Sequence, residues 1–98
     1  MRFEPGDHVT ITLREPREKL LGILSEISHA GVSVRAIDLS YFEDWVQSIV
    51  SGEPHLPMND LFLPMWRVEK VSRDEPNGEI PSMTEQFEAR TKRSFSEF

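Results

Sequence analysis

The chain contains no cysteine, so disulfide bridges and metal sites built on thiolates are both excluded. It has no apolar run approaching the ~20 residues that a bilayer-spanning helix needs. Its first residues, Met1 to Asp7, also lack the apolar stretch of a secretion signal. From these absences we expect a soluble cytoplasmic domain without a membrane partner.

Positive charge is scarce as well, since 11 Lys and Arg stand against 17 Asp and Glu and leave a net charge of −6. Proteins that bind nucleic acids usually present a basic face to the phosphates. The balance therefore disfavours RNA as a partner and gives no reason to expect DNA. The length of 98 residues, with 38% hydrophobic and 29% charged residues, is typical of one globular domain. A domain of this size is only modestly stable alone, and oligomerisation is a common remedy.

Short segments of alternating polarity predict a mainly β chain. Val9, Ile11 and Leu13 alternate with polar residues over positions 8–13, which is the period of a half-buried strand. Four further strands are expected at residues 20–27, 32–39, 61–64 and 67–71. A helix is the alternative for 20–27, but Gly22 and the lack of capping residues favour a strand.

Two positions within these strands predict distortions. Gly22 indicates a sharp bend or a close approach of two backbones. The apolar phase of the third strand slips between Val34 and Ile37. A slip of this kind turns side chains to the wrong face unless a bulge absorbs it, so we expect a bulge or strong bend near Arg35-Ala36.

Two segments have the period of a helix. One is expected at about 41–51, from the spacing of its large apolar residues Phe42, Trp45, Val46, Ile49 and Val50. The pattern Ser82-x-x-Glu85 is a capping box and predicts a second helix through about Arg90. We expect residues 91–98 to be frayed or held by another chain. Residues 1–80 then form a small β-barrel domain with a helical insertion, followed at 81–98 by a C-terminal helix and tail.

Five short, bent strands, two of which meet across a turn containing Pro64, predict a small closed barrel. The run Val9-x-Ile11-x-Leu13 followed by Leu21-Gly22-x-Leu24 resembles the first two strands of the Sm-like family. The segment from Phe62 to Val68 is similar to that family's fourth strand, short turn and fifth strand. The resemblance covers about half of the chain. It implies a five-stranded Sm-like or SH3-like barrel, here with a helix between strands three and four, and copies that pair the fourth strand of one with the fifth strand of the next.

Residues that point to catalysis are few. His8, His29 and His55 are the only histidines, and no two of them have the spacing of a helical metal-binding pair. Neighbouring acids such as Glu43 and Asp44 diverge on a helix and do not form an acid–base pair. The chain has no Gly-x-Ser-x-Gly motif and no glycine-rich phosphate loop. We therefore predict no catalytic residue, no cofactor and no metal site, with a small hydrolase or isomerase as a distant alternative to a non-enzymatic protein.

Two functional hypotheses remain. The favoured one is an assembly or protein-binding module that self-associates through its edge strands or binds a protein partner. Its candidate interface residues are Leu61, Phe62, Leu63, Trp66 and Val68. The alternative is an Sm-like RNA-binding protein, which would combine base stacking with cations. Its candidate contacts are Arg35, Trp66, Arg67 and Lys70, although pairing with nearby acidic residues also explains those cations. Trp66 has a second interpretation too, as a turn residue folded over the barrel mouth.

Overall fold

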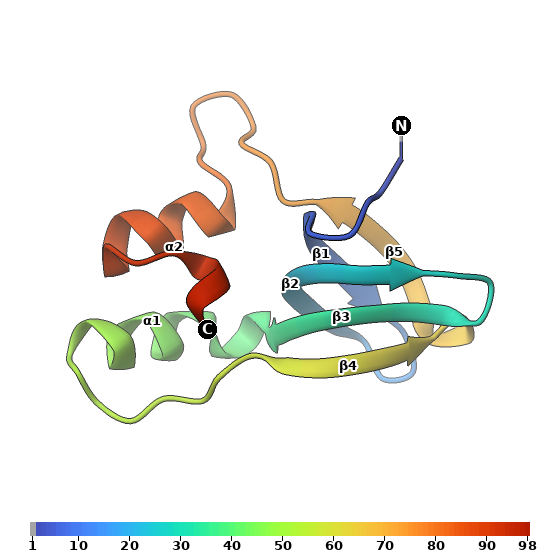
Figure 1. The fold of residues 1–98 in the computed structure, drawn as a ribbon, viewed down its shortest axis with the longest axis horizontal. Helices are drawn as coiled ribbons and strands as arrows, with labels where there is room; N and C mark the ends of the chain where they lie inside the picture. The colour runs from blue at the N-terminus through green and yellow to red at the C-terminus, as the bar shows by residue number, and fades with distance from the viewer. Residues whose placement is uncertain (1) are drawn as a thin grey trace.

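A computed structural model, which describes residues 2–98, contains one curved antiparallel sheet with two helices gathered at one end of it (Figure 1). The strands are β1 (His8–Leu13), β2 (Glu18–Ile27), β3 (Gly31–Asp38), β4 (Asn59–Pro64) and β5 (Val68–Arg73). The helices are α1 (Phe42–Val50) and α2 (Met83–Thr91), and three 3-10 turns are η1 (Leu39–Tyr41), η2 (Met65–Arg67) and η3 (Phe95–Glu97). The prediction of a mainly β chain with a helix between the third and fourth strands is confirmed. Neither helix in this part of the chain has the length and apolarity needed to cross a membrane.

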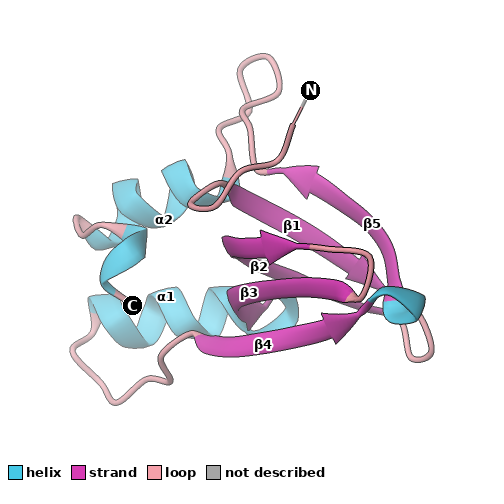
Figure 2. Ribbon diagram, turned by 45° about the vertical axis from the view of Figure 1, so that its right-hand side comes forward, coloured by secondary structure: helices cyan, strands magenta, loops and turns pink. Residues whose placement is uncertain are grey.

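The sheet has two free edges. Its strands follow the order β4-β3-β2-β1-β5, and every ladder between them is antiparallel. Within residues 2–98 no ladder joins β4 to β5, so hydrogen bonding does not close the sheet into the expected barrel. β4 pairs with β3, β5 pairs with β1, and η2 carries the chain between them around the end of the sheet (Figure 2).

One face of the sheet carries the first apolar core. Its buried members are Val9, Ile11, Leu13, Leu20, Leu24, Val32, Val34, Ala36 and Leu63. A Cβ atom at Gly22 would lie 2.3 Å from the carbonyl oxygen of Arg35 and 2.6 Å from the Cβ of Ala36. The predicted close approach of two backbones at Gly22 is therefore confirmed, because only a residue without a side chain lets β2 and β3 come this near.

The opposite face of the sheet packs against the helices in a second core. Its buried members are Leu21, Ile37, Phe42, Trp45, Val46, Met58, Phe87, Phe95 and Phe98. The ring of Trp45 stacks on Phe87 with centroids 4.8 Å apart, and its Nε1 donates a hydrogen bond to the carbonyl of Leu56. This core explains why α1 has one apolar side, as its sequence spacing predicted.

The prediction for the last eight residues is wrong. Instead of fraying or being held by another chain, the tail after α2 folds back through η3, and its two phenylalanines, Phe95 and Phe98, are buried in the second core. The turn after α2 is made by Lys92 in the left-handed conformation, with φ 62°. Because the two rings stand alone between polar residues, no periodic pattern marks them. Tertiary packing decides their position.

The predicted bulge is also misplaced. Arg35 and Ala36 pair regularly with both neighbouring strands, while the register of the β2–β3 ladder shifts between Leu24 and Glu26. The apparent phase slip in β3 has a different cause. Ala36 faces the first core and Ile37 faces the second, so both sides of the strand are buried at this point.

Candidate functional site

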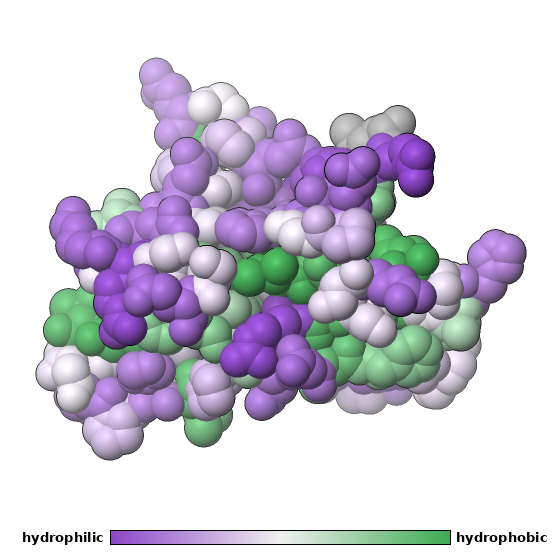
Figure 3. Space-filling view, viewed as in Figure 1, coloured by the Kyte–Doolittle hydropathy of each residue, from purple (hydrophilic) through white to green (hydrophobic). Residues whose placement is uncertain are grey.

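The free edge of β4 is the least protected part of the sheet. On one side β4 pairs with β3 from Asn59 to Pro64, and no other strand in residues 2–98 lies along its opposite side. Its single charged residue, Asp60, forms an ion pair with Arg35 at 3.3 Å. Figure 3 shows hydrophobic surface along the half of this border near η2 and hydrophilic surface along the half near the helices. An apolar, unpaired edge of this kind readily accepts another strand.

Large apolar side chains project to solvent along the same edge. Phe62 is 57% exposed in the middle of β4, and Trp66 is 60% exposed in η2. Phe62 packs over Gly31 of the neighbouring strand, where an added Cβ would lie 2.8 Å from the ring Cζ. The glycine thus makes room for the ring on the outer side of the sheet, opposite to the side on which Leu61 and Leu63 meet the first core.

The turn that carries Trp66 is held firmly. Arg67 donates hydrogen bonds to the carbonyls of Arg14 and Pro16 at 2.6 and 2.8 Å, and it forms an ion pair with Glu18 at 2.8 Å. In return the Nε of Arg14 donates to the carbonyl of Trp66 at 2.8 Å. Because the backbone of η2 is tied to the β1–β2 connection, Trp66 is presented on a rigid support, which reduces the entropy lost when a partner binds.

The structure separates the five candidate interface residues into two groups. Phe62 and Trp66 are exposed, whereas Leu63 is buried and Leu61 and Val68 are half-buried against the first core. Only the two aromatic side chains therefore offer a large exposed apolar surface to a partner. Leu61 and Leu63 contribute through the backbone of the edge strand.

The four candidate RNA contacts do not lie on one patch. Arg35 lies opposite Asp60 at the helix end of β4, and Trp66 and Arg67 follow its other end. At roughly 3.3 Å per residue, about 13 Å of strand separates Asp60 from Pro64. The Arg35 and Arg67 guanidinium groups are both occupied by ion pairs.

Lys70 lies on β5 in different surroundings. It is exposed and pairs in register with Thr12, whose other neighbour in the sheet is Lys19. Two lysines therefore flank one threonine across β2, β1 and β5. This small basic row is separate from the β4 edge.

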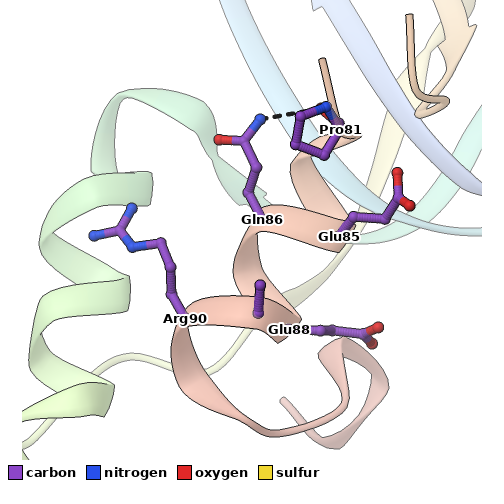
Figure 4. Close-up of a pocket in the computed structure, with 6 residues that line it drawn as sticks. Pro81, Glu85, Gln86, Glu88 and Arg90 are labelled. Carbon is purple, nitrogen blue, oxygen red and sulfur yellow. Dashed lines mark hydrogen bonds between the residues drawn. The ribbon is translucent and has the colours of Figure 1, made fainter. Parts of the chain in front are cut away.

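A shallow depression of about 570 Å³ lies along α2 (Figure 4). Its lining residues are Pro81, Glu85, Gln86, Glu88, Ala89 and Arg90. The polar side chains among them already make structural contacts. Glu85 accepts from the backbone N–H of Ser82 in the capping box, and Glu88 accepts from that of Phe95. The depression is thus built by groups that hold α2 and the tail in place.

Arg90, which also lines this depression, reaches across to α1. It donates to Glu43 at 2.8 Å, and this hydrogen bond holds the pKa of the Glu43 carboxyl below its usual value. The contact stabilises the charged carboxylate, so it is present at neutral pH and is lost as the pH falls through the lowered pKa. Both side chains therefore join the two helices.

The three histidines have different surroundings. His8 meets the edge of Phe95 at a centroid distance of 5.4 Å, His55 meets Phe98 at 5.5 Å, and His29 is exposed between β2 and β3. In the described part of the chain, no three His, Asp or Glu side chains come together in an arrangement that holds a metal ion. The histidines do not converge on a common site.

Sequence reasoning missed one exposed apolar residue beside β4, Leu56. Leu56 stands next to a proline in a segment without periodicity, and an isolated leucine there gives no signal of exposure. The fold and the free edge of β4 define a mainly β chain with one open antiparallel sheet. No family model matches it, and searches of curated proteins and of solved structures also found no match.

Proposed function

We propose that this chain is a non-enzymatic assembly or protein-binding module that self-associates through the free edge of β4. The observation that carries the proposal is the coincidence of an unpaired apolar edge strand with two exposed aromatic side chains, Phe62 and Trp66. Aromatic residues on a rigid support are typical contact residues of protein interfaces. Burying a large apolar side chain of this size contributes about 1.5–3 kcal/mol.

We further propose that the sheet is a small barrel of the Sm-like or SH3-like type, open between β4 and β5. Three features support this assignment. The strands follow one another in a single antiparallel sheet with β4 and β5 at its edges, Gly22 allows the tight approach of β2 to β3, and a 3-10 turn connects the last two strands. In such a fold the two edges are the natural places for another chain to pair.

Truncating both exposed aromatics tests the assembly function. The wild-type chain is expected to show a mass by light scattering that rises with concentration, whereas the double variant Phe62→Ser, Trp66→Ser stays monomeric. Each truncation removes about 1.5–3 kcal/mol of burial, which weakens association by roughly tenfold or more. The matched control truncates two exposed apolar residues away from the edge, Val50 and Ile80, and leaves association unchanged. A wild-type chain that remains monomeric throughout contradicts the proposal.

A second candidate, Sm-like RNA binding, is favoured by the exposed Trp66 and by Lys70 within the row that it forms with Lys19. An aromatic side chain can stack on a base while lysines neutralise phosphates. If this candidate is right, the chain binds single-stranded RNA at low salt, the affinity falls steeply as salt rises, and Lys70→Ala reduces the slope. Absence of binding at low salt eliminates it.

A further inference from the structure

The two edges of the sheet differ in how they are protected. β5 carries Glu69 and Lys70 in its first half, Glu69 forms an ion pair with Arg17, and the ladder of β5 with β1 shifts register between Thr12 and Leu13. Charged residues and a bulge are devices that blunt an edge strand. β4 has a regular ladder, and its second half, Leu61-Phe62-Leu63-Pro64, carries no charge. β4 is therefore the less protected edge. β5 of another copy is a poor strand to pair with it.

We propose that β4 of a second copy of this chain pairs antiparallel with β4 around a twofold axis at Phe62. This inference rests on the proposed assembly function and names its partner. A twofold axis perpendicular to the sheet keeps each face of the sheet continuous, so directly opposed residues must point to the same face. The register centred on Phe62 meets this condition: Phe62 opposes itself on the outer face, and Leu61 opposes Leu63 of the second copy on the core face.

Neighbouring registers are less favourable. Centring the axis on Leu61 would place Asp60 opposite Phe62, and centring it on Leu63 would place Phe62 opposite Pro64. Only the Phe62 register pairs each large apolar residue of the strand with another one. Such self-complementarity is what an interface between identical chains requires.

Antiparallel pairing also brings the flanking segments together. The loop before β4 and the turn η2 after it lie at opposite ends of the strand, and the border between them is uncovered (Figure 1). In the pair, Trp66 of one copy approaches the loop that carries Leu56 in the other. There a shallow depression of about 180 Å³ is lined by Tyr41, Pro54, His55 and Leu56. Four of the seven large apolar residues exposed within residues 2–98 thus meet in one interface: Leu56, Phe62, Met65 and Trp66.

Charge and size determine how strong the pair is. A net charge of −6 makes two copies repel at long range, but along β4 the Asp60 charge is balanced by Arg35. Added salt should therefore strengthen the pair slightly by screening the general repulsion. A strand of six residues gives a small interface, in the range below about 1,200 Å² that is typical of transient contacts. The dimer is accordingly concentration-dependent.

A single cysteine tests the register, since the chain has none of its own. Directly opposed residues in an antiparallel pair have Cα atoms about 4.5–5.5 Å apart, within the range that a disulfide spans. Phe62→Cys pairs more weakly than the wild type but keeps Trp66 and the strand backbone, so under mild oxidation it is still expected to form a covalent dimer. Pairing holds the two thiols at high effective concentration, so its yield should exceed that of Val50→Cys by about tenfold or more. Val50 is the matched control because it is 57% exposed like Phe62 but lies on α1.

A second experiment leaves Phe62 intact. Leu56→Cys and Trp66→Cys chains are mixed and treated with a short thiol cross-linker, and mixed dimers are expected to dominate over like pairs. In a third experiment Phe62→Cys and Lys70→Cys chains are mixed, and mixed dimers without Phe62→Cys homodimers would instead indicate β4–β5 pairing. That result overturns the twofold pair and leaves the assembly function standing. No cross-link in any combination, together with a monomeric wild-type mass, overturns both.

Discussion

The Phe95→Ala variant is expected to lose about 3–5 kcal/mol of unfolding free energy, the usual cost of removing a fully buried aromatic ring. Phe95 is 0% exposed, and its ring meets the edges of Phe87 at 5.4 Å and Trp45 at 6.0 Å. A small domain has only about 5–15 kcal/mol in total, so this variant lies close to the limit of folding. Urea denaturation followed by tryptophan fluorescence measures the loss directly.

The control for this prediction is Phe62→Ala, which removes the same ring from an exposed position. Surface substitutions usually change stability by less than about 0.5 kcal/mol, so the two variants should differ several-fold. If Phe95→Ala were as stable as Phe62→Ala, the tail would not be part of the second core.

Gly22→Ala is expected to destabilise the chain by about 1–3 kcal/mol, the usual cost of forcing an extra carbon into a filled space. The added Cβ would meet the Arg35 carbonyl oxygen at 2.3 Å and the Ala36 Cα at 2.8 Å. Both are backbone atoms of the paired strand, and they cannot move away without breaking the β2–β3 ladder. A loss of 1 kcal/mol lowers the melting temperature of a chain this size by about 4–8 °C, which calorimetry resolves.

Lys19→Ala serves as the control for the glycine substitution, because Lys19 is an exposed residue of the same strand. Its melting temperature should remain close to that of the wild type. An unchanged melting temperature for Gly22→Ala would show that β2 and β3 do not approach as closely as the structure places them.

Local patterns predicted those parts of the fold that local physics decides. The alternation of Val9, Ile11 and Leu13 identified β1, and the capping box of Ser82 and Glu85 located the start of α2, where both reciprocal hydrogen bonds form. In both cases the residues that form the pattern lie within the element that the pattern predicts.

The failures come from contacts between distant elements. The phase slip in β3 suggested a bulge because burial on a second face by the helices was not foreseen at Ile37. Phe95 and Phe98 are too isolated to indicate that the tail forms part of a core.

The sequence predicted only part of the candidate site. Residues 61–64 and 67–71 were identified as the two edge strands, with Trp66 in the turn between them, but all their apolar residues were treated alike. Applying the period of two would have separated Phe62 from Leu61 and Leu63, because alternate residues of a strand point to opposite faces. The exposure of Trp66 follows from hydrogen bonds that Arg14 and Arg67 make across the chain. Local sequence patterns do not indicate such long-range contacts.

Amide hydrogen exchange of the wild-type chain at low and high concentration tests most directly whether association occurs along β4. Peptides covering residues 59–64 should exchange more slowly at high concentration, because a second strand protects amides at the free edge. Peptides covering 68–73 should exchange equally in both samples. Protection confined to 68–73, or identical exchange of 59–64 in samples whose mass shows association, would contradict the account.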